Sequence, residues 1–303
     1  MFFRNLTLFR FSPAVAADLA ELDAGLAEHR LRDIGPIEQH VKGFVSPLGR
    51  NEEALTHGCG PFTLLMAGSQ DKVLPAAVVN DEVFSKIHKI GEQEGRKVSG
   101  RERKRIKDDV LTELLQRAFV RQGRTAAYLD DRSGWMVVDT SSRKLAENVV
   151  SMVREALGSF PAVPLAPEVS PRAVLTDWLA TGNIPQGFAL GEECELRDPA
   201  TATGAVVRAR RQDMDSEEVR EHLRNGKQVF SLGLVFDERL SFVLGEDLSI
   251  RKLKFFDVVL DELGDGSRET LAAELDARFA LMTLELERLL LRLVGIFKLE
   301  RPE

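Results

Sequence analysis

Residues 96–107 of this 303-residue chain read RKVSGRERKRIK, with seven basic side chains and a single acidic one, Glu102. Ser99 precedes Glu102 by three residues, which is the spacing of a capping box and marks the start of a helix. Apolar residues recur at helical spacing on both sides of Ser99 and Gly100, so we expect two helices that meet there. The stretch 77–121 is therefore predicted to fold as a helical hairpin with its positive charge near the tip.

Each helix of this hairpin has an apolar face. The first helix is expected to be capped by Asn80, and the second to run to about residue 120. With the apolar faces packed together, the basic side chains are left on the outside of the hairpin end. The apolar positions are Val79, Val83, Ile87 and Ile90 in the first helix, and Ile106, Val110, Leu114 and Phe119 in the second.

The hairpin is basic although the chain as a whole is acidic. The full sequence has 41 Lys+Arg and 48 Asp+Glu, a net charge of −7, whereas residues 76–125 have 12 basic and 8 acidic residues. Positive charge concentrated on one element of an acidic protein indicates a polyanionic partner, and a nucleic-acid backbone is the commonest one. A solvated helix face is the alternative explanation for such a charge run.

Outside the hairpin the sequence alternates between strand and helix patterns. We expect one helix to begin at Pro13 and end near residue 29, and another to span 141–157, where Gly158 closes it. The proline-rich segment 160–167 is the clearest domain boundary. Strands are expected at 2–11, 62–67, 125–129 and 135–139.

The C-terminal part has the pattern of an antiparallel sheet with helices. One helix begins at Ser170 and Pro171, a second is capped by the segment 215–218, and the last spans about 268–298. The last helix repeats apolar residues with heptad spacing, which allows either docking on the adjacent sheet or a dimer interface. Strands are expected at 204–210, 227–236, 239–244 and 248–256.

The sequence has few signals for catalysis or metal binding. It lacks the common nucleotide-binding, hydrolase and zinc-protease motifs, and the close pair of His57 and Cys59 has no second pair to complete a metal site. Asp130, Asp131 and Asp139 could hold Mg²⁺ in a nuclease, but turn and strand-end positions explain them more simply. We therefore predict no catalytic residue, no metal and no cofactor.

Membrane insertion is not indicated either. No apolar run approaches the roughly 20 residues that span a bilayer. The N-terminal residues alternate apolar and polar side chains, unlike a signal peptide. The two cysteines, Cys59 and Cys194, are far apart and suit a reducing compartment. We expect a cytoplasmic protein without membrane contact.

Two further basic clusters lie in the C-terminal part. In an extended strand Arg208 and Arg210 would share one face with Arg211 on the other, and Lys252 and Lys254 would likewise share a face. Few aromatic residues accompany these clusters, which argues against base stacking and favours contact with the DNA backbone. The candidate DNA-binding residues are Arg96, Lys97, Arg101, Arg103, Lys104, Arg105, Lys107, Arg117, Arg121, Arg208, Arg210, Arg211, Gln212, Lys252 and Lys254.

Several stretches spread along the chain resemble one bacterial family. None is a mechanistic motif by itself, but their order and spacing together are fairly specific. On these stretches the chain resembles the RdgC family of recombination-associated proteins over essentially its whole length. The stretches are FRNLTLFR (3–10), EALTH (53–57), KVLPAAVV (72–79), LLQRAF (114–119), LGSFPAVPL (157–165), LTDWL (175–179), QGF (186–188), VRARRQD with SEE (207–218), RKLKFFD (251–257) and LMTLELERLL (281–290).

The resemblance implies a non-enzymatic, nucleoid-associated protein that binds mainly duplex DNA without strong sequence preference and restrains RecA-dependent recombination. It implies an α+β subunit with a central mixed α/β domain (1–76 plus 122–166), a helical tip (77–121) and a base of antiparallel sheet plus helix (167–303). Two such subunits are expected to form a ring-shaped homodimer around the DNA.

The resemblance also implies roles for three residues. Phe119 matches the apolar residue at the tip-side dimer contact, and Arg211 with Gln212 matches a Lys-Gln pair associated with DNA binding. Arginine in place of lysine keeps the charge but changes the geometry. Two other functions stay open, namely an adaptor that binds RecA or another recombination factor directly, and a metal-dependent nuclease.

Overall fold

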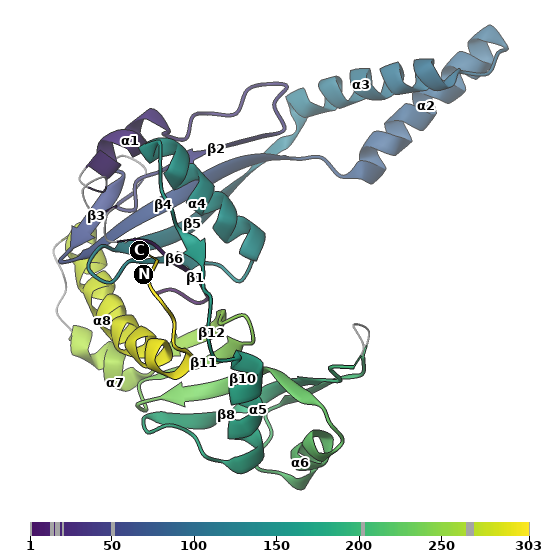
Figure 1. Ribbon diagram of the computed structural model, residues 1–303. Helices are drawn as coiled ribbons and strands as arrows, with labels where there is room; N and C mark the ends of the chain where they lie inside the picture. Colours follow the sequence, from purple (N-terminus) through teal and green to yellow (C-terminus); the bar gives the residue numbers. More distant parts are fainter. Residues whose placement is uncertain are drawn as a thin grey trace. The chain divides into compact units, whose positions relative to one another are not determined.

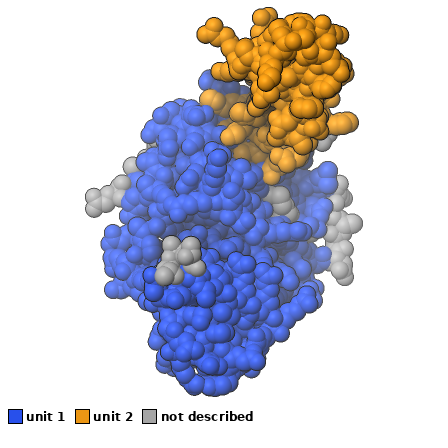
Figure 2. Space-filling model, turned by 90° about the vertical axis from the view of Figure 1, so that its right-hand side faces the viewer, with its two compact units in different colours: residues 1–28, 46–66, 125–303 blue, residues 29–45, 67–124 orange. Residues whose placement is uncertain are grey.

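The computed structural model of the protein is an α+β structure with helices and a large antiparallel sheet (Figure 1). It describes residues 2–12, 15, 19, 21–49, 52–200, 204–264 and 270–302. The chain divides into two compact units (Figure 2): unit 1 comprises residues 1–28, 46–66 and 125–303, and unit 2 comprises residues 29–45 and 67–124. The division into central, tip and base domains stays a prediction.

Unit 2 contains the expected helical hairpin, formed by α2 (Ala76–Glu94) and α3 (Gly100–Arg117) (Figure 1). Its small core is built from Val79, Val83 and Val110, which are all buried. Four partly buried residues of the two helices pack around this core: Ile87, Ile106, Leu111 and Leu114. The hairpin prediction is confirmed, because the apolar faces expected from the sequence meet between the helices.

The ends of the two helices differ in part from the expected ones. The Ser99 side chain accepts a hydrogen bond from the Glu102 amide at 3.3 Å, as the capping box predicts. The cap expected at Asn80 is wrong, since α2 begins one turn earlier, at Ala76 after Pro75. Alanine favours a helix, and a proline just ahead of the first turn has no amide donor to leave unpaired.

The placement of Phe119 on the second helix is also wrong. The helix ends at Arg117, and Phe119 is the first residue of strand β5 (Phe119–Asp130). Strand β4 (Phe62–Val73) is likewise longer than expected, and the boundary between the units falls within both strands. In unit 2, β2 (His40–Phe44) pairs antiparallel with the second half of β4.

The cap at Ser99 gives a first test of the hairpin. Replacing Ser99 with alanine should cost about 1 kcal/mol of local helix stability, because the Glu102 amide loses its acceptor. Amide hydrogen exchange in the first turn of α3 should then speed up about 5-fold. Thr112→Ala is the matched control, since Thr112 only bonds the Asp108 carbonyl of its own helix. Equal protection in Ser99→Ala and the wild type would contradict the capping role.

Unit 1 is built on an antiparallel sheet in the order β5-β6-β1-β12-β11-β10-β8-β9, with β7 on β1 and β3 on the first half of β4. Each strand expected in this unit from the sequence is present, whereas β3, β7 and β8 were not expected. The strands are β1 (Leu6–Arg10), β3 (Thr56–Cys59), β6 (Trp135–Asp139), β7 (Val163–Pro164), β8 (Phe188–Arg197), β9 (Val206–Arg210), β10 (Gln228–Phe236), β11 (Leu240–Gly245) and β12 (Ile250–Phe255).

The helices of unit 1 agree with most of the expected ones. The first expected helix is shorter, and its expected start at Pro13 lies outside the described residues. The cap expected within 215–218 falls at Ser216, without a side-chain hydrogen bond. The helices are α1 (Leu22–Glu28), α4 (Arg143–Leu157), α5 (Pro171–Thr181), α6 (Glu217–Arg224), α7 (Asp257–Leu260), the 3₁₀ helix η2 (Asp261–Leu263) and α8 (Leu271–Phe297). In the part described, no helix could cross a membrane.

The apolar seam of α8 is used within the chain. Phe279, Met282, Leu286, Leu289 and Leu293 are all buried, so intrachain docking of this face is confirmed. The seam therefore requires no second subunit to cover it.

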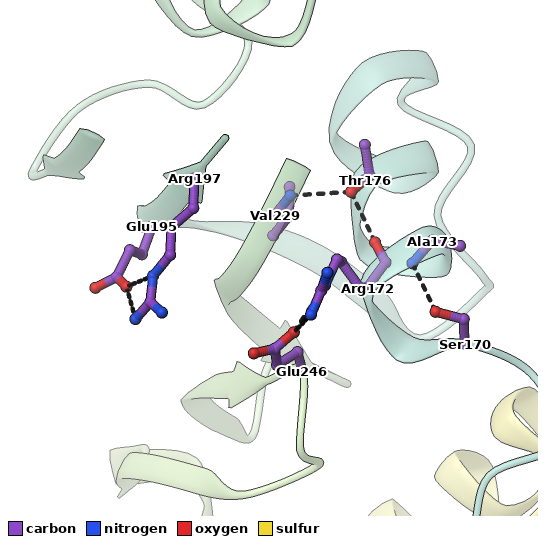
Figure 3. Close-up of polar contacts among 8 residues, drawn as sticks. All are labelled: Ser170, Arg172, Ala173, Thr176, Glu195, Arg197, Val229 and Glu246. Atoms are coloured by element: carbon purple, nitrogen blue, oxygen red, sulfur yellow. Dashed lines mark hydrogen bonds and ion pairs between the residues drawn. The ribbon is translucent and has the colours of Figure 1, made fainter. Parts of the chain in front are cut away.

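Polar contacts join helix α5 to strand β10 (Figure 3). The Thr176 hydroxyl accepts from the Val229 amide at 2.9 Å. Arg172 bonds Glu246 at 2.7 Å through Nε. The Arg172 guanidinium also lies 4.2 Å above the ring of Phe230. These contacts join α5 to β10, and the Arg172 guanidinium is already engaged within the fold.

Candidate nucleic-acid interface

The end of the hairpin in unit 2 carries six exposed cations, which we call the tip cations: Lys97, Arg101, Arg103, Lys104, Arg105 and Lys107. Among the described residues, none of the six forms an ion pair within the chain. Successive helical residues are about 100° apart, so Arg103, Lys104 and Arg105 point to three different sides of α3. The hairpin end therefore has positive charge on several sides, and none of the six side chains is held in an ion pair with a described residue.

Three other predicted DNA-binding residues of unit 2 lie near acidic side chains, which makes them less available to DNA. Arg96 is held by Glu94 at 2.6 Å and by both carboxylate oxygens of Glu102 at 2.7 and 2.8 Å, and the Glu102 bond raises the pKa of Arg96. Arg117 pairs with Glu113 at 2.5 Å. Arg121 lies 3.9 Å from Asp71 and is 73% exposed, so its charge is only weakly compensated. Of these three arginines, Arg121 therefore has the charge that is most available to a ligand.

A second basic surface lies in unit 1, on the sheet. Strands β8, β10, β11 and β12 enclose an open groove of about 640 Å³, which we call the sheet groove. Its floor includes Gly233 and Ser241. Six charged residues line it: Arg210, Arg211, Lys252, Lys254, Glu192 and Glu193. The structure thus brings together four cations that the sequence places in two separate clusters.

The expectation that Arg211 faces away from Arg210 is wrong. Strand β9 ends at Arg210, and Arg211 has a left-handed backbone with a φ of 54°. The alternation of an extended strand stops there, and both side chains line the sheet groove. The shared face of Lys252 and Lys254 is confirmed, although Lys252, with a φ of 52°, sits in an irregularity of the β11–β12 pairing.

Acidic residues pair with part of this second surface. Lys252 forms an ion pair with Glu193. Arg208 bonds Glu195 at 2.7 Å and does not line the sheet groove. Glu195 also binds Arg197 (Figure 3). In the described part of the chain, Arg210, Arg211 and Lys254 form no ion pair.

Gln212 lies beside the groove rather than in it. Its side-chain amide donates to Glu218 at 2.7 Å and to the Ser216 hydroxyl at 3.2 Å. Together with Arg211 it lines a smaller hollow of about 330 Å³. A ligand that used the Gln212 amide would have to take it from these two partners.

Phe119 is an exposed aromatic residue. Its side chain is 86% exposed at the start of β5, and the next residue, Val120, is 43% exposed. A large apolar side chain this open to solvent is typical of a contact surface for another molecule.

The residues considered for metal chemistry have other roles. Asp130 is buried and accepts from the Ser133 amide at 3.0 Å, as a turn residue does. Asp139 accepts from the amides of Arg4 and Asn5, and burial raises its pKa. His57 contacts Asp276 at 3.1 Å. No group of three or more possible metal ligands occurs among the described residues.

The sequence interpretation missed the two glutamates of the sheet groove. Glu192 and Glu193 belong to β8, a strand whose pattern of glycine and acidic residues does not alternate. Their proximity to Lys252 depends on strand pairing between distant segments, for which the sequence has no local signal.

Comparison with known proteins gives a consistent result. Residues 1–300 match the family described as "RdgC: Putative exonuclease, RdgC". The "Recombination-associated protein RdgC" of Xanthomonas campestris pv. campestris (strain B100) is 52% identical, and that of Xanthomonas axonopodis pv. citri (strain 306) is 51% identical, with 100% of both chains covered in each case. The protein of the same name from Xylella fastidiosa (strain 9a5c) is 51% identical over 99% of each chain. This chain therefore belongs to the RdgC family of recombination-associated proteins.

Proposed function

We propose that this protein binds DNA without sequence preference, mainly duplex DNA, through contacts of its tip cations with the phosphate backbone. The observation that carries this proposal is the set of six exposed cations at the hairpin end, which form no ion pair with any described residue, in a chain whose net charge is −7. Phosphate contacts supply most of the affinity of nonspecific DNA binding. The name of the relatives connects the family with recombination.

The proposal includes a ring-shaped homodimer on the nucleoid that restrains RecA-dependent recombination by occupying DNA. An exposed aromatic residue, Phe119, supports a subunit contact at the start of β5. A closed ring holds DNA topologically, so strong base contacts are unnecessary. Outside the tip and the sheet groove, the net negative charge of the chain disfavours contact with polyanions.

We propose a non-enzymatic role, and the alternative is the nuclease that the family description names. In support of the non-enzymatic role, Asp130 and Asp139 already accept backbone hydrogen bonds in a turn and at a strand end. Incubating circular plasmid with the protein and Mg²⁺ distinguishes the two. We expect intact plasmid, whereas nicked or shortened DNA would establish nuclease activity.

A gel-shift experiment with purified protein and DNA alone tests the proposed function. We expect two unrelated duplexes of equal length to shift at the same protein concentration. An adaptor that acts only through RecA or another recombination factor would give no shift without that factor. A shift with only one of the two sequences would contradict binding through the backbone.

A further inference from the structure

The sheet groove contains both cations and carboxylates, and a site that binds only phosphate would not need the carboxylates. Arg210, Arg211 and Lys254 bring three cations that form no ion pair with a described residue, whereas Glu192 and the Lys252-paired Glu193 bring two carboxylates into the same groove. Carboxylates repel phosphate, so a surface that only follows a DNA backbone gains nothing from them. The ligand that fits is one with both anionic groups and hydrogen-bond donors.

The hollow itself results from an irregular pairing of β8 with β10. Leu232 of β10 pairs with Cys194 and Leu234 pairs with Leu190, so Gly233 alone faces three residues of β8. A side chain at Gly233 would come within 3.0 Å of the Glu193 carbonyl oxygen. Glycine at position 233 therefore lets the backbones of β8 and β10 approach closely, and the absence of a side chain there leaves the groove open.

Two of the groove cations are held on an unfavourable backbone. Arg211 and Lys252 are both non-glycine residues with positive φ. The left-handed conformation costs free energy for such residues and persists where the surroundings or a function require it. Because both strained positions supply cations to one groove, the strain supports a binding role for that groove.

An unpaired nucleotide has the chemistry that this groove offers. Its phosphate can be bound by arginine and lysine, and the amino group of its base can donate to a glutamate, as cytosine N4 does. In a duplex one hydrogen of each amino group is used in base pairing and only the other is open to the major groove, whereas an unpaired base presents both hydrogens and can donate to two glutamates at once. The groove volume of about 640 Å³ also lies in the usual range for small-ligand sites.

We propose that the sheet groove binds a single unpaired nucleotide of a DNA strand. Arg210, Arg211 and Lys254 contact its phosphates, and Glu192 and Glu193 accept from the amino group of its base. This inference rests on the proposed DNA binding and adds to it a preference for DNA with unpaired positions. Glu193 then exchanges its bond with Lys252 for a bond with the base.

Competition between three DNA probes tests this inference. The first is a fully paired duplex, the second carries one extra unpaired cytosine, and the third has an abasic site in place of that cytosine. We expect the full-length protein to bind the cytosine probe about 10-fold more tightly than the other two. The abasic probe has the same flexible backbone, so it separates recognition of the base from bending of the DNA.

A variant that fills the sheet groove tests whether the preference for the unpaired cytosine arises in this groove. In Ser241→Leu a larger side chain occupies the floor of the groove without a change of charge, and the preference should disappear while duplex affinity stays the same. Ser151→Leu, at an exposed position of α4, is the matched control and should retain the preference. If Ser241→Leu does not fold, Glu193→Gln should likewise reduce the preference at constant volume.

The outcomes distinguish this inference from the function on which it rests. Equal affinity for all three probes, or a preference that persists in Ser241→Leu, overturns the nucleotide site and leaves duplex binding intact. Failure to bind any of the probes contradicts the proposed DNA binding itself.

Discussion

Replacing Arg103, Lys104 and Arg105 together with alanine is expected to weaken duplex binding about 100-fold near 0.1 M salt. All three side chains are exposed and form no ion pair with the residues that the structure describes, so their charge can displace counterions from DNA. Each lost phosphate contact should make the slope of log K against log salt less negative by about 0.9, or about 2.7 for three contacts. Anisotropy titrations over a salt series measure both quantities.

A control with the same change in charge separates local contacts from net charge. Lys42, Arg143 and Lys144 are exposed cations that do not belong to the hairpin, and their triple alanine variant should change affinity only a few-fold. The tip variant should also unfold at the same denaturant concentration as the wild type, since exposed substitutions cost little. Equal losses of affinity in the two triple variants would mean that the tip is not the binding surface.

Phe119→Ala is expected to shorten the lifetime of complexes on closed circular DNA by at least about 10-fold. An exposed aromatic residue at the centre of a subunit contact supplies a large share of the contact's free energy. The side chain is 86% exposed, so its loss should leave the stability of the subunit itself unchanged. Affinity for short linear duplexes should change little, because the tip cations remain.

Phe84→Ala is the matched control for this variant. Phe84 is another exposed phenylalanine of unit 2, 69% exposed on α2, and the proposed contact does not include it. Retention of each variant on relaxed circular plasmid, before and after linearisation, is the measurement. If Phe119→Ala dissociates from circles no faster than Phe84→Ala, the subunit contact at Phe119 does not close a ring.

The hairpin could be predicted because its signals are local. A serine three residues before a glutamate fixes the start of α3, and apolar residues at helical spacing identify the face that packs on α2. The seam of α8 was equally clear as a pattern. The pattern alone did not distinguish docking on the sheet from a dimer interface, and only the burial of residues such as Leu286 and Leu293 did so.

The parts that were missed depend on contacts between distant segments. The sequence of β8 has no regular alternation of apolar and polar residues, and the strand pairs irregularly with β10. Its sequence pattern therefore does not indicate a strand. The turn of Arg211 into the groove depends on where β9 stops pairing with β8. The neutralisation of Arg96 depends on Glu102, six residues away on the next helix. None of these can be derived from local spacing.

The salt dependence of binding by the unmodified protein is the most direct measurement of contact with the DNA backbone. Affinity for two unrelated duplexes of equal length should be measured from 50 to 200 mM salt. We expect both sequences to follow one straight line of log K against log salt, with a slope of about −5 for each subunit whose six tip cations contact phosphates. A slope near zero, or clearly different affinities for the two sequences, would contradict binding through the phosphate backbone.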